Sequence, residues 1–154
     1  MAAIITVVVA AIMGIRQLGN PVKARHAQLF MPLYDTFRNR EFAEQYSDIL
    51  FRHQWKDFDD WLHKYGPMEN PTDFSSWVSV CSYFEGVGVL VKRKLIDIDL
   101  VDDLLSTEIR WLWEKIEPIA KEYRAQYNRP QLWEYFEYFY KEMRKRDEKK
   151  AFGK

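Results

Sequence analysis

A short cluster of possible metal ligands occurs at Asp59, Asp60 and His63. Residues three and four apart share one face of an α-helix, so the imidazole would lie beside both carboxylates. Such a cluster is half of a metal site. A di-iron site in a helical bundle would also need Glu-x-x-His motifs, and the sequence contains none. The favoured interpretation is therefore a solvated acidic helix face with an i,i+4 pair.

Glu85 interrupts a predicted helix surface of apolar and small residues. A buried carboxylate needs a partner, because removing its charge from water is costly. Arg110 or Arg124 on the next predicted helix would supply one, so we expect a structural ion pair. A bundle enzyme or metal-binding sensor that combines Glu85 with the Asp59, Asp60 and His63 cluster is the second interpretation.

Aromatic residues make up 16% of the chain. The run from Trp133 to Tyr140 covers more than one helix face, and Trp111 lies off the apolar seam that contains Leu112. Exposed aromatic side chains mark protein interfaces. We therefore expect Trp111, Tyr138 and Tyr140 to contribute to an interface, although a thicker core or a homodimer would satisfy the same residues.

The elements that must position these residues are all helical, and strand signals are absent. Apolar residues recur at helical spacing throughout the body of the chain. The spacing and capping residues predict helices over residues 22–38, 41–52, 55–65, 73–94, 97–126 and 130–149. Asp73 is the expected N-cap of the fourth of these, and Pro130 the expected start of the last. The fold class is therefore all-α, with an antiparallel bundle of four or five helices.

The N-terminus carries a different signal, because residues 2–15 contain only one polar side chain, that of Thr6. This stretch is shorter than the roughly 20 apolar residues of a full membrane span. A cleaved signal peptide would need a basic region before the apolar run, and a soluble core helix would be less β-branched. A membrane-anchor helix over residues 1–19 is the favoured interpretation, with its apolar surface formed by Ile4, Ile5, Val7, Val8, Val9, Ile12 and Ile15.

Positive charge follows the apolar run. Residues 1–40 carry five bases and one acid, residues 41–120 have a net charge of −8, and the whole chain is neutral. Arg16 lies near the end of the predicted anchor, and Lys23 and Arg25 lie in the predicted basic juxtamembrane helix of residues 20–40. These three bases together form the basic juxtamembrane segment. The positive-inside rule then places the bundle of residues 41–149 on the cytoplasmic side. A basic tail end at 150–154 completes the division of the chain.

Several short motifs stand out along the predicted helices: the Gly-rich segment from Phe84 to Val91, the Leu95-Ile96-Asp97 turn, Trp113-Glu114, Arg124 and the segment from Trp133 to Tyr138. Together they resemble the motifs of the domain of unknown function 4760 family. The resemblance covers about residues 40–140 and the placement of the anchor. It implies a small helical protein with an N-terminal membrane helix, and it implies no activity, cofactor or catalytic residue.

The function expected from these features is that of a non-enzymatic, single-pass membrane protein. We expect an accessory or scaffold subunit of a larger membrane complex, contacting other membrane-protein subunits and the lipid bilayer through residues 1–19. No cofactor or metal is predicted. The chain is not basic overall, which disfavours nucleic-acid binding, and a homo-oligomer remains open.

Overall fold

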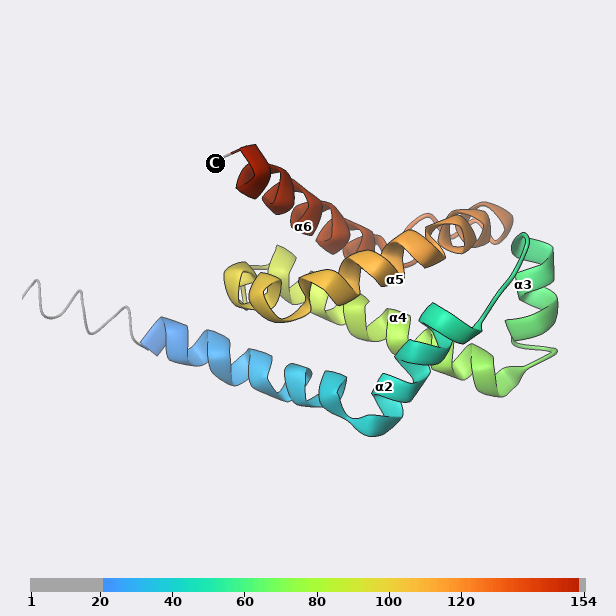
Figure 1. The fold of residues 1–154 in the computed structure, drawn as a ribbon, viewed down its shortest axis with the longest axis horizontal. Coiled ribbons are helices and arrows are strands. Elements are labelled where there is room, and N and C mark those ends of the chain that lie inside the picture. The colour runs from blue at the N-terminus through green and yellow to red at the C-terminus, as the bar shows by residue number, and fades with distance from the viewer. Residues whose placement is uncertain (1–20, 153–154) are drawn as a thin grey trace, which may run out of the picture.

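The computed structural model describes residues 21–152 (Figure 1), and this part of the chain is helical without any strand. The prediction of an all-α fold is therefore confirmed. The first helix covers residues 21–38 and is called the N-terminal helix. The elements that follow are α2 (Arg40–Ser47), the π-helix η1 (Asp48–Arg52), α3 (Phe58–Tyr65), α4 (Pro71–Lys92), α5 (Ile98–Gln126) and α6 (Glu134–Phe152).

The long helices of the described chain pack side by side (Figure 1). The N-terminal helix lies against α4, where the Tyr83 hydroxyl donates a hydrogen bond to the Leu33 carbonyl at 2.9 Å. Arg124 near the end of α5 pairs with Glu137 near the start of α6, whereas Arg110 pairs with Asp147 further along α6. These pairs show that α5 and α6 run in opposite directions.

Helix α4 begins at Pro71, two residues earlier than the sequence predicted, and its N-cap is Asn70 rather than Asp73. The Asn70 side chain accepts a hydrogen bond from the Asp73 N–H and donates one to the Asp73 carboxylate. Proline is favoured at the first position of a helix, where its missing N–H costs nothing. The sequence offered Asp97 or Asp99 as the cap of α5, and the structure uses Asp97, whose side chain accepts a hydrogen bond from the Asp99 N–H.

Helix α6 begins at Glu134 rather than at the expected Pro130. The intervening residues form turns, and Trp133 adopts a positive φ of 54° immediately before the helix. A tryptophan side chain carries no acceptor oxygen for the free N–H groups of a helix start. The start of α6 must therefore obtain its cap from elsewhere in the fold.

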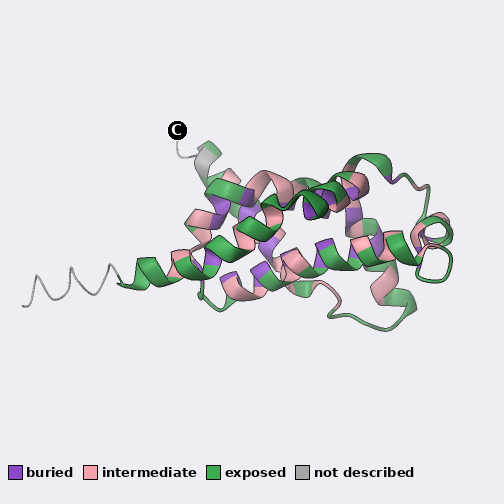
Figure 2. Cartoon of the chain, turned by 90° about the horizontal axis from the view of Figure 1, so that it is seen from below, coloured by how far each residue is buried: buried purple, intermediate pink, exposed green. Residues whose placement is uncertain are grey.

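The core explains much of the aromatic content. Trp61, Trp77, Trp113, Phe84 and Phe136 are completely buried. In Figure 2 the buried residues lie on the sides of the helices that face one another. The rings of Phe84 and Phe136 stack across the contact between α4 and α6, with centroids 5.0 Å apart. Aromatic side chains bury large areas and hold defined orientations, so they suit a core built from few helices.

Among the described residues, α4 is the helix whose length and composition would suffice to cross a membrane. Its Trp77, Val80, Phe84 and Val87 side chains are fully buried in the core, which accounts for its apolar character. The predicted anchor of residues 1–19, with Arg16, lies outside the described residues, as does the end of the predicted basic tail.

Candidate functional site

Of the three possible metal ligands of α3, Asp60 is engaged in local contacts, whereas Asp59 and His63 are exposed. Asp60 accepts hydrogen bonds from Lys64 Nζ at 2.8 Å and from the backbone N–H of Lys56, and these bonds lower the pKa of its carboxyl. Within residues 21–152 no group of three or more His, Cys, Asp and Glu side chains is arranged to hold a metal ion. The structure does not bring the three residues together with Glu85 in such a group.

Glu85 lies at the junction of α4 with α6. Its carboxylate accepts the backbone N–H of Phe136 at 2.8 Å and also that of Tyr135. These N–H groups belong to the first turn of α6, which has no partner for them within its own helix. Glu85 therefore serves as the missing cap of α6, supplied from a residue about fifty positions earlier in the chain.

The predicted ion pair of Glu85 with Arg110 or Arg124 is wrong, because both arginines pair with other carboxylates. Arg110 pairs with Asp147 at 2.6 Å, and Arg124 pairs with Glu137 at 2.6 Å. Burial raises the pKa of Glu85, against the lowering effect of the two N–H groups and of the nearby Arg124 charge. The helix start competes successfully for the carboxylate because it offers two converging donors and the positive end of the helix dipole.

His53 is a buried histidine, and no motif in the sequence indicated its role. Its Nδ1 accepts a hydrogen bond from Trp77 Nε1 at 3.0 Å, and its ring stacks on Tyr65 with centroids 4.1 Å apart. Its Nε2 lies 3.7 Å from the Asp73 carboxylate. An accepting Nδ1 requires the neutral ring, because a protonated imidazole donates from both nitrogens. The contacts of both ring nitrogens make His53 a structural residue.

We expect the stability contributed by His53 to be lost in mild acid. Burial lowers the pKa of His53 below its usual 6.5, with Lys115 adding to this effect and the Asp73 and Asp48 charges opposing it. The unfolded chain therefore binds a proton first as the pH falls through about 6.5, which favours unfolding. Urea denaturation at pH values above and below this point should show a steeper loss of stability for the natural protein than for His53→Gln. Equal pH dependence would contradict the assignment.

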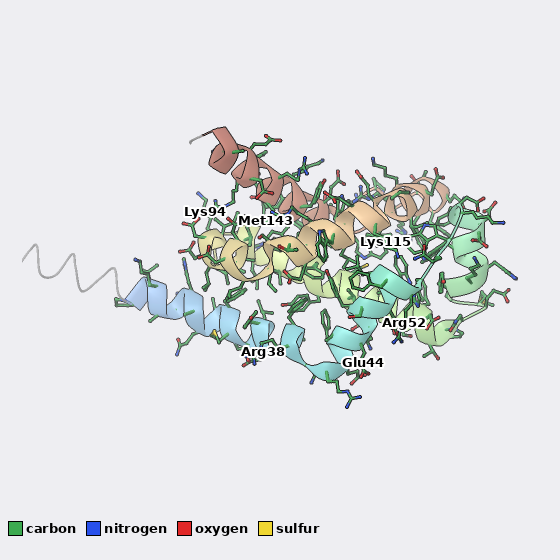
Figure 3. All side chains as sticks on the ribbon, in the orientation of Figure 1. Arg38, Glu44, Arg52, Lys94, Lys115 and Met143 are labelled. Atoms are coloured by element: carbon green, nitrogen blue, oxygen red, sulfur yellow. The ribbon has the colours of Figure 1, made fainter. Side chains whose placement is uncertain are left out.

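Lys115 of α5 joins this region to η1. Its Nζ donates hydrogen bonds to the carbonyls of Leu50 at 2.6 Å and His53 at 2.8 Å, and it lies 5.0 Å from the ring centroid of Trp55. The last carbonyls of a helix lack intrahelical partners, and a cation there is favoured by the dipole. Figure 3 labels Lys115 and Arg52, which mark where α5 passes the end of η1.

Two large aromatic side chains are exposed in the region where α5 packs along η1. The Tyr46 hydroxyl donates a hydrogen bond to the Glu108 carbonyl, and Lys115 Nζ donates one to the Leu50 carbonyl. The end of α2 and η1 therefore follow one face of α5. Trp111 lies between Glu108 and Lys115 in the sequence of α5 and is 54% exposed, and Phe51, which follows Leu50 in η1, is 63% exposed. We call Phe51 and Trp111 the aromatic surface. The prediction that Trp111 is exposed is confirmed.

Tyr138 and Tyr140 are half-buried and pack against the core. Lys92 Nζ lies 4.3 Å from the ring centroid of Tyr138, and the Tyr140 hydroxyl donates to Glu114 at 3.3 Å. The structure thus assigns these two rings to contacts inside the fold. Of the three predicted interface residues, Trp111 is the one that remains largely available to a partner.

The fold and these contacts define a small helical domain whose buried His53 and half-buried Glu85 are engaged in holding the helices together. The chain belongs to the DUF4760 family, a domain of unknown function, whose model matches residues 1–143. This match confirms the family resemblance that the sequence motifs indicated. No curated protein and no solved structure matches the chain.

Proposed function

We propose that this protein is a non-enzymatic, single-pass membrane protein that acts as an accessory or scaffold subunit of a larger membrane complex. Residues 1–19 would anchor it in the bilayer, and the helical domain would lie on the cytoplasmic side. Other membrane-protein subunits would bind the helical domain through the aromatic surface of Phe51 and Trp111.

The exposure of the aromatic surface is the observation that carries this proposal. Most aromatic side chains of the described residues are buried or half-buried, yet Phe51 and Trp111 lie largely in water on adjoining elements. Large aromatic side chains provide much of the binding energy at protein interfaces, because each buries a large area with few rotatable bonds. Neither residue is needed to fill the core of this domain.

The sequence supports the anchor. Residues 2–15 are apolar apart from Thr6, and bases follow at Arg16, Lys23 and Arg25. Lys23 and Arg25 are exposed at the start of the N-terminal helix. Bases that follow a single apolar segment favour retention of that flank on the cytoplasmic side.

A photocrosslinking amino acid at position 111 of the full chain tests the docking proposal in native membranes. We expect it to capture a defined membrane protein, and we expect Phe51→Ala to reduce this capture by about tenfold or more, as for the loss of a buried aromatic anchor. Tyr127 supplies the matched control, because it is also an exposed aromatic residue of the α5 region. A crosslinker at position 127 should not capture the same protein.

Two results would contradict the proposal. Equal capture from positions 111 and 127 would show nonspecific contact. Extraction of the full chain from membranes by alkaline carbonate would show that residues 1–19 do not anchor it. Phe51→Ala and Trp111→Ala should change the free energy of unfolding by no more than about 0.5 kcal/mol, because both positions are exposed.

A further inference from the structure

Basic residues from distant parts of the sequence meet at one end of the described molecule. Lys23 and Arg25 lie at the start of the N-terminal helix, and Lys92, Arg93 and Lys94 lie at the end of α4. One shallow groove is lined by His26, Lys94 and Arg146, and it joins these elements to α6. Figure 1 shows the start of the N-terminal helix and the α4–α5 turn at the same end, and Figure 3 labels Lys94 there. We call this the basic end.

The charges of the basic end are only partly neutralised inside the fold. Arg146 pairs with Asp99 and Asp102. The other acids facing this end also have internal roles, since Asp97 caps α5 and Glu142 pairs with Lys145, although Asp103 is exposed. Within residues 21–152, no salt bridge is formed by Lys23, Arg25, Arg93 or Lys94, and all four are exposed. A surplus of positive charge therefore faces the solvent.

Apolar side chains are exposed among these bases. Leu95, at the tip of the α4–α5 turn, is 40% exposed, and Val22 is exposed between Pro21 and Lys23. Lys94 adopts a positive φ of 56°, and the Leu95 N–H closes the turn by donating to the Leu90 carbonyl at 2.9 Å. This turn presents two free bases and an apolar side chain together. Basic residues interspersed with exposed apolar ones are typical of surfaces that bind anionic lipid.

The position of the chain at this end identifies the occupant. The described chain begins at Pro21, shortly after the predicted anchor of residues 1–19, and the start of the N-terminal helix lies at the basic end. Residues 21–25 are all exposed, and His26 is the first residue of the helix to line the groove. Five helical residues span about 7.5 Å. The headgroup layer on each side of a bilayer is about 5–8 Å thick, so the exposed turns of this helix match it in length.

We propose that the basic end docks on the anionic lipid surface of the membrane that holds the anchor, with Arg93, Lys94 and Leu95 in contact with the headgroups. This inference rests on the proposed function, because it takes residues 1–19 as the anchor. Docking holds the long helices upright on the bilayer. The aromatic surface, formed by η1 and the middle of α5, then lies above the headgroups at the side of the domain.

The test uses the full chain reconstituted into vesicles of phosphatidylcholine, with or without phosphatidylserine. An environment-sensitive fluorophore is attached to a cysteine introduced by Leu95→Cys. The natural Cys81 is fully buried and does not compete for the label. The control label is attached to a cysteine introduced by Met68→Cys. Met68 is 88% exposed and precedes the N-terminal end of α4, whereas Leu95 follows its C-terminal end. Helix α4 is about 33 Å long, so the two labels lie far apart.

We expect quenching by spin-labelled lipid at position 95 in the anionic vesicles only, and none at position 68. Arg93→Gln combined with Lys94→Asn should reduce the ratio of docked to undocked protein by about 25-fold, since each base near an anionic surface contributes about a fivefold factor. Lys56→Gln combined with Arg129→Gln, two exposed bases outside the basic end, should leave quenching unchanged. Raised salt should weaken it.

The outcomes separate the two proposals. Flotation of the chain with both kinds of vesicle, together with identical signals at position 95, would overturn docking and leave the anchor intact. Failure to float with either kind would overturn the anchor and docking together. A change at position 95 on addition of RNA without vesicles would overturn lipid as the occupant.

Discussion

Replacing Gly88 by alanine is expected to lower the free energy of unfolding by about 3 kcal/mol, the upper part of the range for overpacking. A Cβ atom at this position would overlap the backbone carbonyl of Tyr135, lying 2.6 Å from its carbon. The obstacle is backbone rather than the end of a flexible side chain, so α4 and α6 would have to separate. For a chain of this length, the loss corresponds to a fall in melting temperature of about 6–12 °C.

Gly86 is the matched control, two residues earlier in the same helix. A Cβ atom there would meet nothing within 4 Å. Alanine is the better helix former, so Gly86→Ala should stabilise the protein by about 0.5–1 kcal/mol. Thermal unfolding of both variants measures the difference directly. If Gly88→Ala proved as stable as Gly86→Ala, the close approach of α4 and α6 described here would be incorrect.

The helix boundaries that local chemistry sets were predictable from the sequence. Asp97, which the sequence offered together with Asp99 as a possible cap, caps α5, and the N-terminal helix ends at residue 38 as expected. The start of α4 was missed because Asn70 and Asp73 are both good capping residues. Pro71 was the signal that distinguishes them, because proline prefers the first helical position after the cap.

The partner of Glu85 was not predictable once the start of α6 had been misplaced. The sequence indicated correctly that this carboxylate needs a partner. With α6 expected to begin at Pro130, the free N–H groups of its first turn would fall before Glu134, away from those that Glu85 binds. The true start at Glu134 depends on a contact with α4, which is tertiary rather than local.

Tertiary contacts also explain the other differences. His53 bonds to Trp77, 24 residues away, and Lys115 bonds to the His53 carbonyl, 62 residues away. No helical spacing relates such residues. Trp111 was correctly expected to be exposed because it lies off the seam of its own helix. Tyr138 and Tyr140 are half-buried because they pack against the core, and they also contact Lys92 and Glu114.

Removing the Glu85 carboxylate is expected to be the second strongly destabilising change. Glu85→Ala leaves the Phe136 and Tyr135 N–H groups without their acceptor, a loss of about 2–4 kcal/mol for two bonds to a charged group. Glu85→Gln retains an acceptor oxygen and should cost about 1 kcal/mol. Urea denaturation of the three proteins at neutral pH measures these differences. A loss from Glu85→Ala no larger than that from Glu85→Gln would contradict the capping role.

The pH dependence of the stability difference between the natural protein and Glu85→Gln shows whether folding favours the protonated or the ionised form of Glu85. Burial raises the pKa of Glu85 above its usual 4.5. At pH values between 4.5 and the raised pKa of the folded state, the folded protein binds more protons than the unfolded chain. The contribution of Glu85 to stability therefore falls as the pH rises through the folded-state pKa. The stability of the natural protein relative to Glu85→Gln should therefore increase as the pH is lowered from neutral toward 4.5. A decrease over that range would show that the α6 N-terminus and Arg124 outweigh burial, so that the ionised carboxylate is favoured on folding.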